Sequence, residues 1–174
     1  MAVLPERGRV LDLGSGGGLP GLVLATYRPE LELTLLEARR RACRFLREAV
    51  TALDLARVAV VEARAEDAAR RPDLREAFDA VVARSFGPPA VTAECAVGFL
   101  RIGGRLVVSE PPGGEERDGA TARWPVPGLE DLGYAPPAAG GGSGASFVVL
   151  EKTRRDDRWP RRVGVPAKRP VWTL

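Results

Sequence analysis

The sequence predicts an α/β fold with a mostly parallel sheet, and three observations support this prediction. Short apolar runs alternate with segments whose apolar residues recur at three- and four-residue spacing. A run of glycines follows the first apolar stretch, as expected of a tight turn between a strand and a helix. The length of 174 residues suits a single domain. Strands that alternate with helices imply crossover connections between parallel neighbours.

The first part of the chain has the clearest alternation. Its first apolar run ends in glycines, and the helical pattern that follows stops before Pro29, because the residue before a proline disfavours helical backbone. The strongest amphipathic pattern is that of residues 39–53. We therefore expect strands at 10–13, 33–37 and 58–61, and helices at 19–27 and 39–53.

The second part of the chain is less regular. Gly103 and Gly104 are expected to close a helix, and the glycine-rich residues 139–144 a flexible turn. Between these points the pattern is poor, with a loop expected at 111–114 and a short helix at 129–132. We expect strands at 79–83, 105–109 and 146–150, and a helix at 90–100.

The composition excludes several kinds of chemistry. The chain has no histidine, so Ser-His-Asp and Cys-His catalysis and every His-ligated metal site are excluded, and we expect no metal. Cys43 and Cys95 are expected to be free thiols in a reducing compartment. Neither a signal-peptide pattern nor an apolar run near 18 residues is present, so we expect a cytoplasmic protein with no membrane partner.

The basic residues gather at the C-terminus. Residues 151–174 contain eight basic and three acidic side chains, a net charge of +5, whereas the first 150 residues carry −2. Two interpretations stay open: a solvated, partly disordered tail, or an arm that contacts phosphates. We accordingly divide the chain into a catalytic body, residues 1–152, and a basic Pro/Arg-rich tail, residues 153–174.

The glycine loop indicates a nucleoside cofactor. It opens a helix, whose N-terminus attracts anionic groups, and Glu37 follows at the end of the second strand, where a carboxylate can bind ribose hydroxyls. The spacing Gly16-x-Gly18-x-x-Gly21 matches a dinucleotide fingerprint, which alone is weak. S-adenosylmethionine fits better because Asp12, just before the loop, would attract its amino group and would repel a pyrophosphate. A purely structural glycine turn is the remaining alternative.

Two further strand ends carry candidate residues. Backbone groups around Ala65 and Glu66, after the third strand, are placed to read an adenine edge; the alternative is a helix turn rich in acids. Arg84 follows the fourth strand, where its guanidinium can hold a phosphate or the cofactor carboxylate. A surface ion pair is the alternative for Arg84.

Together, residues 10–21, 28–46, 64–66 and 83–86 and the tail 159–170 resemble the RsmG (GidB) family of bacterial methyltransferases, which methylate guanine N7 in small-subunit ribosomal RNA. The resemblance implies a class I S-adenosylmethionine-dependent methyltransferase fold, a Rossmann-like, mostly parallel seven-stranded sheet with helices on both faces. It implies S-adenosylmethionine as the cofactor and ribosomal RNA or the small ribosomal subunit as the partner. The cofactor residues it points to, with the loop residues above, are Asp12, Gly14, Gly16, Gly18, Leu19, Glu37, Ala65, Glu66 and Arg84.

The chain departs from the family in two places. The family has a helical N-terminal extension, whereas here the first strand begins near Arg9. The family tends to carry a Lys-Gly pair after the fifth strand, where this chain has Ser109-Glu110. Both regions would border the RNA, so the cofactor site is better supported than the substrate.

Methylation of guanine N7 is compatible with the missing histidine. N7 carries a lone pair and no proton, so no general base is needed, and positioning supplies the catalysis. Arg84 would position the substrate or cofactor, and Phe86 or Trp159 would stack on a base. For Trp159, packing against the sheet is the alternative. The side chains expected to contact RNA are Arg161, Arg162, Lys168 and Arg169. The alternatives are a methyltransferase for a small molecule or protein, and a cofactor-binding module without turnover; a monomer is favoured.

Overall fold

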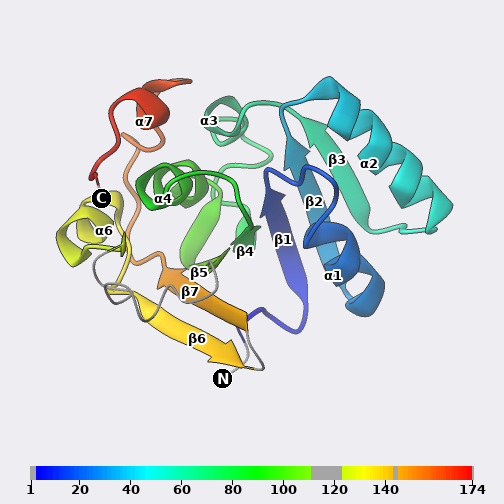
Figure 1. The fold of residues 1–174 in the computed structure, drawn as a ribbon, viewed down its shortest axis with the longest axis horizontal. Helices are drawn as coiled ribbons and strands as arrows, with labels where there is room; N and C mark the ends of the chain where they lie inside the picture. Colours follow the sequence, from blue (N-terminus) through cyan, green and yellow to red (C-terminus); the bar gives the residue numbers. More distant parts are fainter. Residues whose placement is uncertain (1–2, 111–122, 143–144, 174) are drawn as a thin grey trace.

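The computed structural model describes residues 3–110, 123–142 and 145–173. Its strands are β1 (Gly8–Leu13), β2 (Leu31–Glu37), β3 (Val58–Glu62), β4 (Phe78–Ala83), β5 (Leu100–Ser109), β6 (Ala138–Gly142) and β7 (Ala145–Glu151). They form one seven-stranded sheet in the order β3-β2-β1-β4-β5-β7-β6 (Figure 1). The first five strands of this order are parallel, and β7 is antiparallel to both β5 and β6. The predicted mostly parallel, seven-stranded sheet is confirmed.

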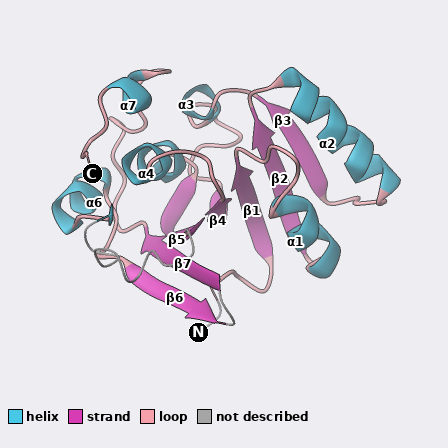
Figure 2. Ribbon diagram, in the orientation of Figure 1, coloured by secondary structure: helices cyan, strands magenta, loops and turns pink. Residues whose placement is uncertain are grey.

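Helices cover both faces of the sheet (Figure 2). They are α1 (Gly21–Tyr27), α2 (Arg40–Ala52), α3 (Ala65–Ala68), α4 (Pro89–Val97), α6 (Val126–Leu132) and α7 (Val165–Lys168). Successive residues of a strand point to opposite faces. Val10 of β1 accordingly packs in one apolar cluster with Ala25 of α1, whereas its neighbour Leu11 packs in a second cluster with Ala93 of α4. Both faces are therefore apolar, as in other parallel sheets.

The strand order reverses beside β1. Its two neighbours are β2 and β4, so the connections leave β1 and β4 in opposite directions along the sheet. Ligands of open α/β sheets bind at such a switch point, outside the carboxyl ends of the strands. The carboxyl ends of β1, β2, β3 and β4 lie at one edge, and the functional residues are found there.

The helix predicted at 90–100 is shorter than expected. It ends at Val97, and Leu100 already pairs with Phe78 as the first residue of β5. The glycine pair does not close the helix but lies within an irregular stretch of β5, where Gly103 has a φ of +78°. A Cβ on Gly104 would lie 3.0 Å from the Phe78 carbonyl oxygen. The prediction failed because Phe99 and Leu100 are fully buried and extend the apolar run of the helix.

The turn predicted at 139–144 is wrong over residues 139–142; residues 143 and 144 lie outside the described residues. Residues 138–142 form β6, an outer strand that pairs antiparallel with β7. Glycine has no side chain that could alternate between the two faces of a sheet. The sequence therefore gives no signal for this strand, although its backbone pairs with β7. The short helix expected at 129–132 is present within α6. The loop expected at 111–114 lies outside the described residues.

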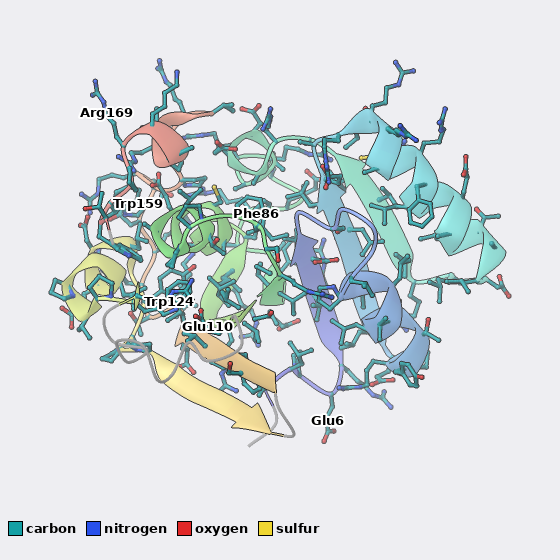
Figure 3. All side chains as sticks on the ribbon, viewed as in Figure 1. Glu6, Phe86, Glu110, Trp124, Trp159 and Arg169 are labelled. Carbon is teal, nitrogen blue, oxygen red and sulfur yellow. The ribbon has the colours of Figure 1, made fainter. Side chains whose placement is uncertain are left out.

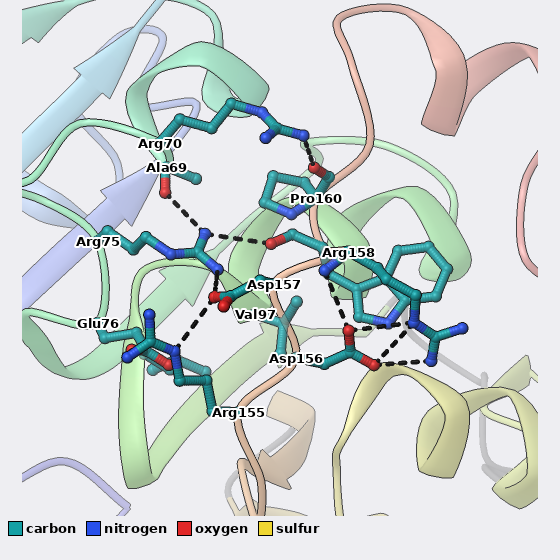
Figure 4. A network of polar contacts seen from close by, with 12 residues as sticks. Ala69, Arg70, Arg75, Glu76, Val97, Arg155, Asp156, Asp157, Arg158 and Pro160 are labelled. Carbon is teal, nitrogen blue, oxygen red and sulfur yellow. Dashed lines mark hydrogen bonds and ion pairs between the residues drawn. The ribbon is translucent and has the colours of Figure 1, made fainter.

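The C-terminal segment, residues 153–173, packs against the body of the fold. Trp159 is only 7% exposed and belongs to the larger apolar cluster. Figure 4 shows the polar contacts beside it: the Arg75 guanidinium donates to the Trp159 carbonyl at 3.2 Å and to Asp157 at 2.9 Å. Arg70 donates to the Pro160 carbonyl at 2.5 Å (Figure 4). The segment therefore lies along the face that carries α3 and α4. The division of the chain into a body and a basic tail, and the contact of that tail with phosphates, stay predictions.

Both cysteines are buried and unpaired, as predicted. Burial is the main reason why the pKa values of Cys43 and Cys95 are raised, so both thiols stay protonated at neutral pH. Within the described part of the chain, every helix is too short or too polar to cross a bilayer.

Candidate functional site: two adjoining pockets at the carboxyl edge of the sheet

The glycine loop closes tightly over the end of β1. The backbone N–H groups of Gly14 and Ser15 both donate to the Leu36 carbonyl, at 2.9 and 3.0 Å. Gly14 has a φ of +74°, and a Cβ on it would lie 2.6 Å from the Phe86 ring. Any side chain at this position would therefore be strained and would push Phe86 away. The loop brings the carboxyl ends of β1 and β4 into contact.

Glu37 ends β2 and links the glycine loop to α2. Its Oε2 accepts the Gly16 N–H at 2.9 Å, and its Oε1 accepts the Arg39 backbone N–H at 2.8 Å and the Arg39 Nε–H at 3.2 Å. Burial alone would raise the pKa of Glu37, but the hydrogen bonds from Arg39 and Gly16 outweigh it and lower the pKa below its usual value. Glu37 is therefore a fixed, ionised acceptor.

A pocket of about 400 Å³ opens beside Glu37, and we call it the first pocket. Its volume falls within the range of small-molecule sites. It is lined by residues from the ends of β1, β2, β3 and β4, namely Leu13, Gly14, Leu36, Glu37, Ala38, Arg39, Ala63, Arg64, Ala65, Glu66, Ser85 and Phe86. Of the predicted cofactor residues, the pocket brings together Gly14, Glu37, Ala65 and Glu66. The Glu37 carboxylate can accept a hydrogen bond from a ribose hydroxyl, and Ala38, Ala63 and Ala65 provide an apolar wall. The pocket therefore fits a nucleoside such as that of S-adenosylmethionine.

The other predicted cofactor residues lie outside this lining. Gly16 and Gly18 belong to the loop behind it, and Gly18 packs closely on Leu22 of α1. Leu19 is 50% exposed. Asp12 is fully buried: its Oδ2 accepts the Gly21 N–H at 3.0 Å, and its Oδ1 has no hydrogen-bond partner among the described residues. Instead of facing the pocket, as the sequence argument assumed, the Asp12 carboxylate holds the start of α1.

Burial gives Asp12 an unusual titration. It raises the pKa from its ordinary 3.8 to about 6, although the neighbouring Ser15 hydroxyl and the hydrogen bond from the Gly21 N–H oppose the shift. The unfolded chain therefore loses this proton near pH 4 and the folded protein only near pH 6. Across that window the free energy of unfolding falls as the pH rises, by up to about 3 kcal/mol, and the loss is complete above pH 6.

We expect Asp12→Asn to remove this pH dependence. The amide oxygen still accepts the Gly21 N–H, but no charge is buried. The variant's gain in stability over the wild type should therefore grow from pH 4 to pH 6 and then stay constant. Urea unfolding without cofactor at pH 4, 5, 6 and 7 measures it, with the exposed Asp67→Asn as the matched control. A difference that is the same at every pH would contradict the assignment.

Glu66 connects the first pocket to the C-terminal segment. Its Oε1 accepts the Gly164 N–H at 2.9 Å, across 98 positions of sequence. This contact was not predicted, and no short-range sequence signal marks it. The C-terminal segment therefore lies beside the cofactor-sized pocket.

A second pocket, of about 530 Å³, adjoins the first. It shares Ser85 and Phe86 with it and extends to the end of β5 and to Trp124. Arg84 lines this second pocket rather than the first. Its side chain is exposed and makes no hydrogen bond or ion pair with any residue that the structure describes. Figure 3 shows Phe86 at the end of β4, with Glu110 and Trp124 in the region below it.

The four basic residues predicted to contact RNA differ in their surroundings. Arg161 forms a bidentate ion pair with Glu94 of α4, with Nε to Oε1 at 2.8 Å and Nη2 to Oε2 at 2.6 Å. Glu94 is fully buried, so this pair is structural. Arg162, Lys168 and Arg169 are exposed, and their side chains have no ion-pair partner within the described ranges. They remain available to an anionic ligand.

The comparisons with known proteins point to one family. A family model described as rRNA small subunit methyltransferase G (GidB) matches residues 1–112. The ribosomal RNA small subunit methyltransferase G of Moorella thermoacetica is 36% identical over 175 residues, which cover 97% of this chain and 71% of the relative. The protein of the same name from Rubrobacter xylanophilus is 41% identical over 177 residues, covering 97% and 67%. The similarity therefore continues through the C-terminal segment.

Solved structures agree on the fold. The S-adenosylmethionine-dependent methyltransferase SibL has a TM-score of 0.65 at 21% identity and covers 85% of this chain and 51% of its own. The T. thermophilus 16S rRNA N2 G1207 methyltransferase RsmC, solved with AdoMet and guanosine, has a TM-score of 0.61 at 21% identity, with 91% and 38% covered. At these identities the likeness shows the fold alone, and that fold is the methyltransferase sheet.

Proposed function

The chain belongs to the rRNA small subunit methyltransferase G family, and from this premise we propose that it transfers a methyl group from S-adenosylmethionine to N7 of a guanine in small-subunit ribosomal RNA. The observation that carries the proposal is the pair of adjoining pockets, which share Ser85 and Phe86. One pocket has the size and polar groups for a nucleoside cofactor, and its neighbour is open to a second molecule. A cytoplasmic monomer that works on ribosomal RNA is the corresponding proposal for location and assembly.

The first pocket is proposed to hold the cofactor. Glu37 would accept a hydrogen bond from a ribose hydroxyl at its remaining lone pair, because it is ionised and rigidly held. The alanine-lined wall and the backbone at Ala65 and Glu66 would bind the adenine. The cofactor supplies an electrophilic methyl group on its sulfonium.

The second pocket is proposed to hold the acceptor base. Phe86 lies between the two pockets and offers an aromatic surface on which a base can stack. Guanine N7 carries its lone pair in the ring plane and no proton, so this chain has no proton to remove. Its task is to hold N7 in line with the methyl group, and positioning of that kind accelerates transfer strongly. Arg84 would hold a phosphate beside the base.

The exposed cations of the C-terminal segment support an RNA substrate. Arg162, Lys168 and Arg169 lie on the segment that contacts Glu66 through Gly164, next to the first pocket. Because binding of phosphates by cations releases counterions, RNA affinity should fall with salt. Replacing these three residues by alanine should lower RNA affinity and reduce the salt slope by about one for each phosphate that is no longer bound. Binding titrations at several salt concentrations measure it, and an unchanged slope would remove this surface from the account.

Methyl transfer to isolated small subunits tests the proposed function. The subunits come from a strain that lacks the enzyme, and the donor carries a labelled methyl group. Mass spectrometry of the digested RNA should find one 7-methylguanosine. Label at another atom would replace the N7 assignment, and label on proteins or small molecules only would favour the alternative acceptors.

A further inference from the structure

A carboxylate is held rigidly at the end of the second pocket. Glu110 follows β5 and lines the pocket, but its side chain is only 9% exposed. Its Oε1 accepts the Trp124 Nε1–H at 3.0 Å, and its Oε2 is paired with Arg123 Nη1. The backbone N–H of Glu110 donates to the Ser146 carbonyl at 2.9 Å. Both the carboxylate and the backbone of Glu110 are therefore held by hydrogen bonds.

The donors that fix Glu110 are held by packing and by a backbone hydrogen bond. Trp124 is fully buried and packs edge-on against Trp172, with ring centroids 6.5 Å apart. Arg123 is held from its backbone as well, because its carbonyl accepts the Trp172 Nε1–H at 3.2 Å. The arrangement fixes the direction of the two carboxylate oxygens.

The carboxylate keeps acceptor capacity in this arrangement. A carboxylate has about four lone-pair sites; among the residues that the structure describes, Arg123 occupies one on Oε2 and Trp124 one on Oε1. The two sites that remain suit a ligand edge with two adjacent N–H donors. Guanine is the only one of the four RNA bases with such an edge, formed by N1–H and the exocyclic N2 amino group. Adenine places an acceptor, N1, at the matching position and would be repelled.

We propose that Glu110 reads the Watson–Crick edge of the acceptor guanine and is the residue that selects the base. This inference rests on the proposed function and deepens it. The Watson–Crick edge and N7 lie on opposite sides of the purine. A guanine held by Glu110 at the β5 end of the second pocket would therefore direct N7 toward Phe86 and the first pocket. Base selection and methyl alignment would follow from the same contact.

Inosine provides the test because it is guanosine without the N2 amino group. Single-turnover methyl transfer is measured with small-subunit RNA that carries guanosine or inosine at the target position. For the wild type we expect the rate to fall about tenfold to a hundredfold with inosine, as for the removal of a base-edge hydrogen bond to a charged group. For Glu110→Ala the guanosine rate should fall similarly, and the further inosine penalty should nearly vanish.

Two controls keep the outcome interpretable. Glu110→Gln retains the shape of the side chain, so it serves if the alanine variant does not fold, and it should also lose the discrimination. Glu130→Gln alters an exposed acid of α6 and should behave as the wild type. An inosine penalty of equal size in the wild type and both Glu110 variants would overturn the inference.

A binding measurement separates this inference from the proposed function. Guanosine and inosine monophosphates are titrated into the wild type and Glu110→Gln. A preference for guanosine that depends on Glu110, found without any methyl transfer to RNA, would keep the inference and defeat the proposed function. Transfer to guanine N7 without such a preference would do the reverse.

Discussion

Glu37→Ala is expected to weaken the binding of S-adenosylhomocysteine by roughly tenfold to a hundredfold. Gly16 and Arg39 leave Glu37 one lone pair for a ribose hydroxyl, and a hydrogen bond to a charged acceptor is worth about 1.5–3 kcal/mol. Glu37 is ionised, nearly buried and aligned by Gly16 and Arg39, so the ribose would meet a preorganised group. Calorimetric titration of the variant measures the effect. Its thermal unfolding is followed in parallel, because the substitution also releases the Gly16 N–H.

The matched control for this prediction is Glu62→Ala. Glu62 ends β3 directly beside Glu37 in the sheet register, but it is exposed, pairs with Arg47 and lies outside the pocket lining. Its removal should leave the affinity unchanged. Equal affinities of the Glu37 variant and the wild type would show that the ribose binds elsewhere.

Arg161→Met is expected to lower the free energy of unfolding by about 3–5 kcal/mol, because it leaves Glu94 charged, buried and without its guanidinium partner. The Arg161 backbone N–H, at 2.9 Å from Glu94, is the contact that remains. Adding Glu94→Gln should recover a large part of this stability, since the buried charge is then removed as well. Urea unfolding of the single and double variants measures both effects.

Arg158→Met is the control for this second prediction. Arg158, like Arg161, lies over the Trp159 ring, but its side chain is 61% exposed, so its guanidinium is open to solvent in the ion pairs with Asp131 and Asp156. An exposed pair of this kind contributes about 0–1 kcal/mol. Similar destabilisation of the Arg158 and Arg161 variants would show that burial of Glu94 does not decide the stability of the C-terminal segment.

The sequence predicted those parts of the fold in which the pattern is local. Strands 10–13 and 33–37 and the helix at 39–53 carry complete apolar periods, and all three are present. The glycine strand β6 has no side-chain period to detect. The irregular stretch of β5 follows an apolar run that continues past the end of α4, so periodicity could not mark the boundary.

In the candidate site too, residues at strand ends were predictable from the sequence, whereas contacts between distant segments were not. Gly14 and Glu37 were predictable because strand ends of a parallel sheet meet at one edge. The ion pair of Glu94 with Arg161 spans 67 positions and the contact of Glu66 with Gly164 spans 98, so neither leaves a local trace. The Glu110 cluster was visible only as an acid where the resembled family is basic. Its support by Trp124 depends on tertiary packing.

Calorimetric titration of the folded protein with S-adenosylhomocysteine tests cofactor binding in the first pocket, which every function considered for this chain requires. We expect saturable binding at one site per chain, and no competition by a nicotinamide dinucleotide. A folded sample that gives no binding heat with S-adenosylhomocysteine, or that binds the dinucleotide more tightly, would contradict it.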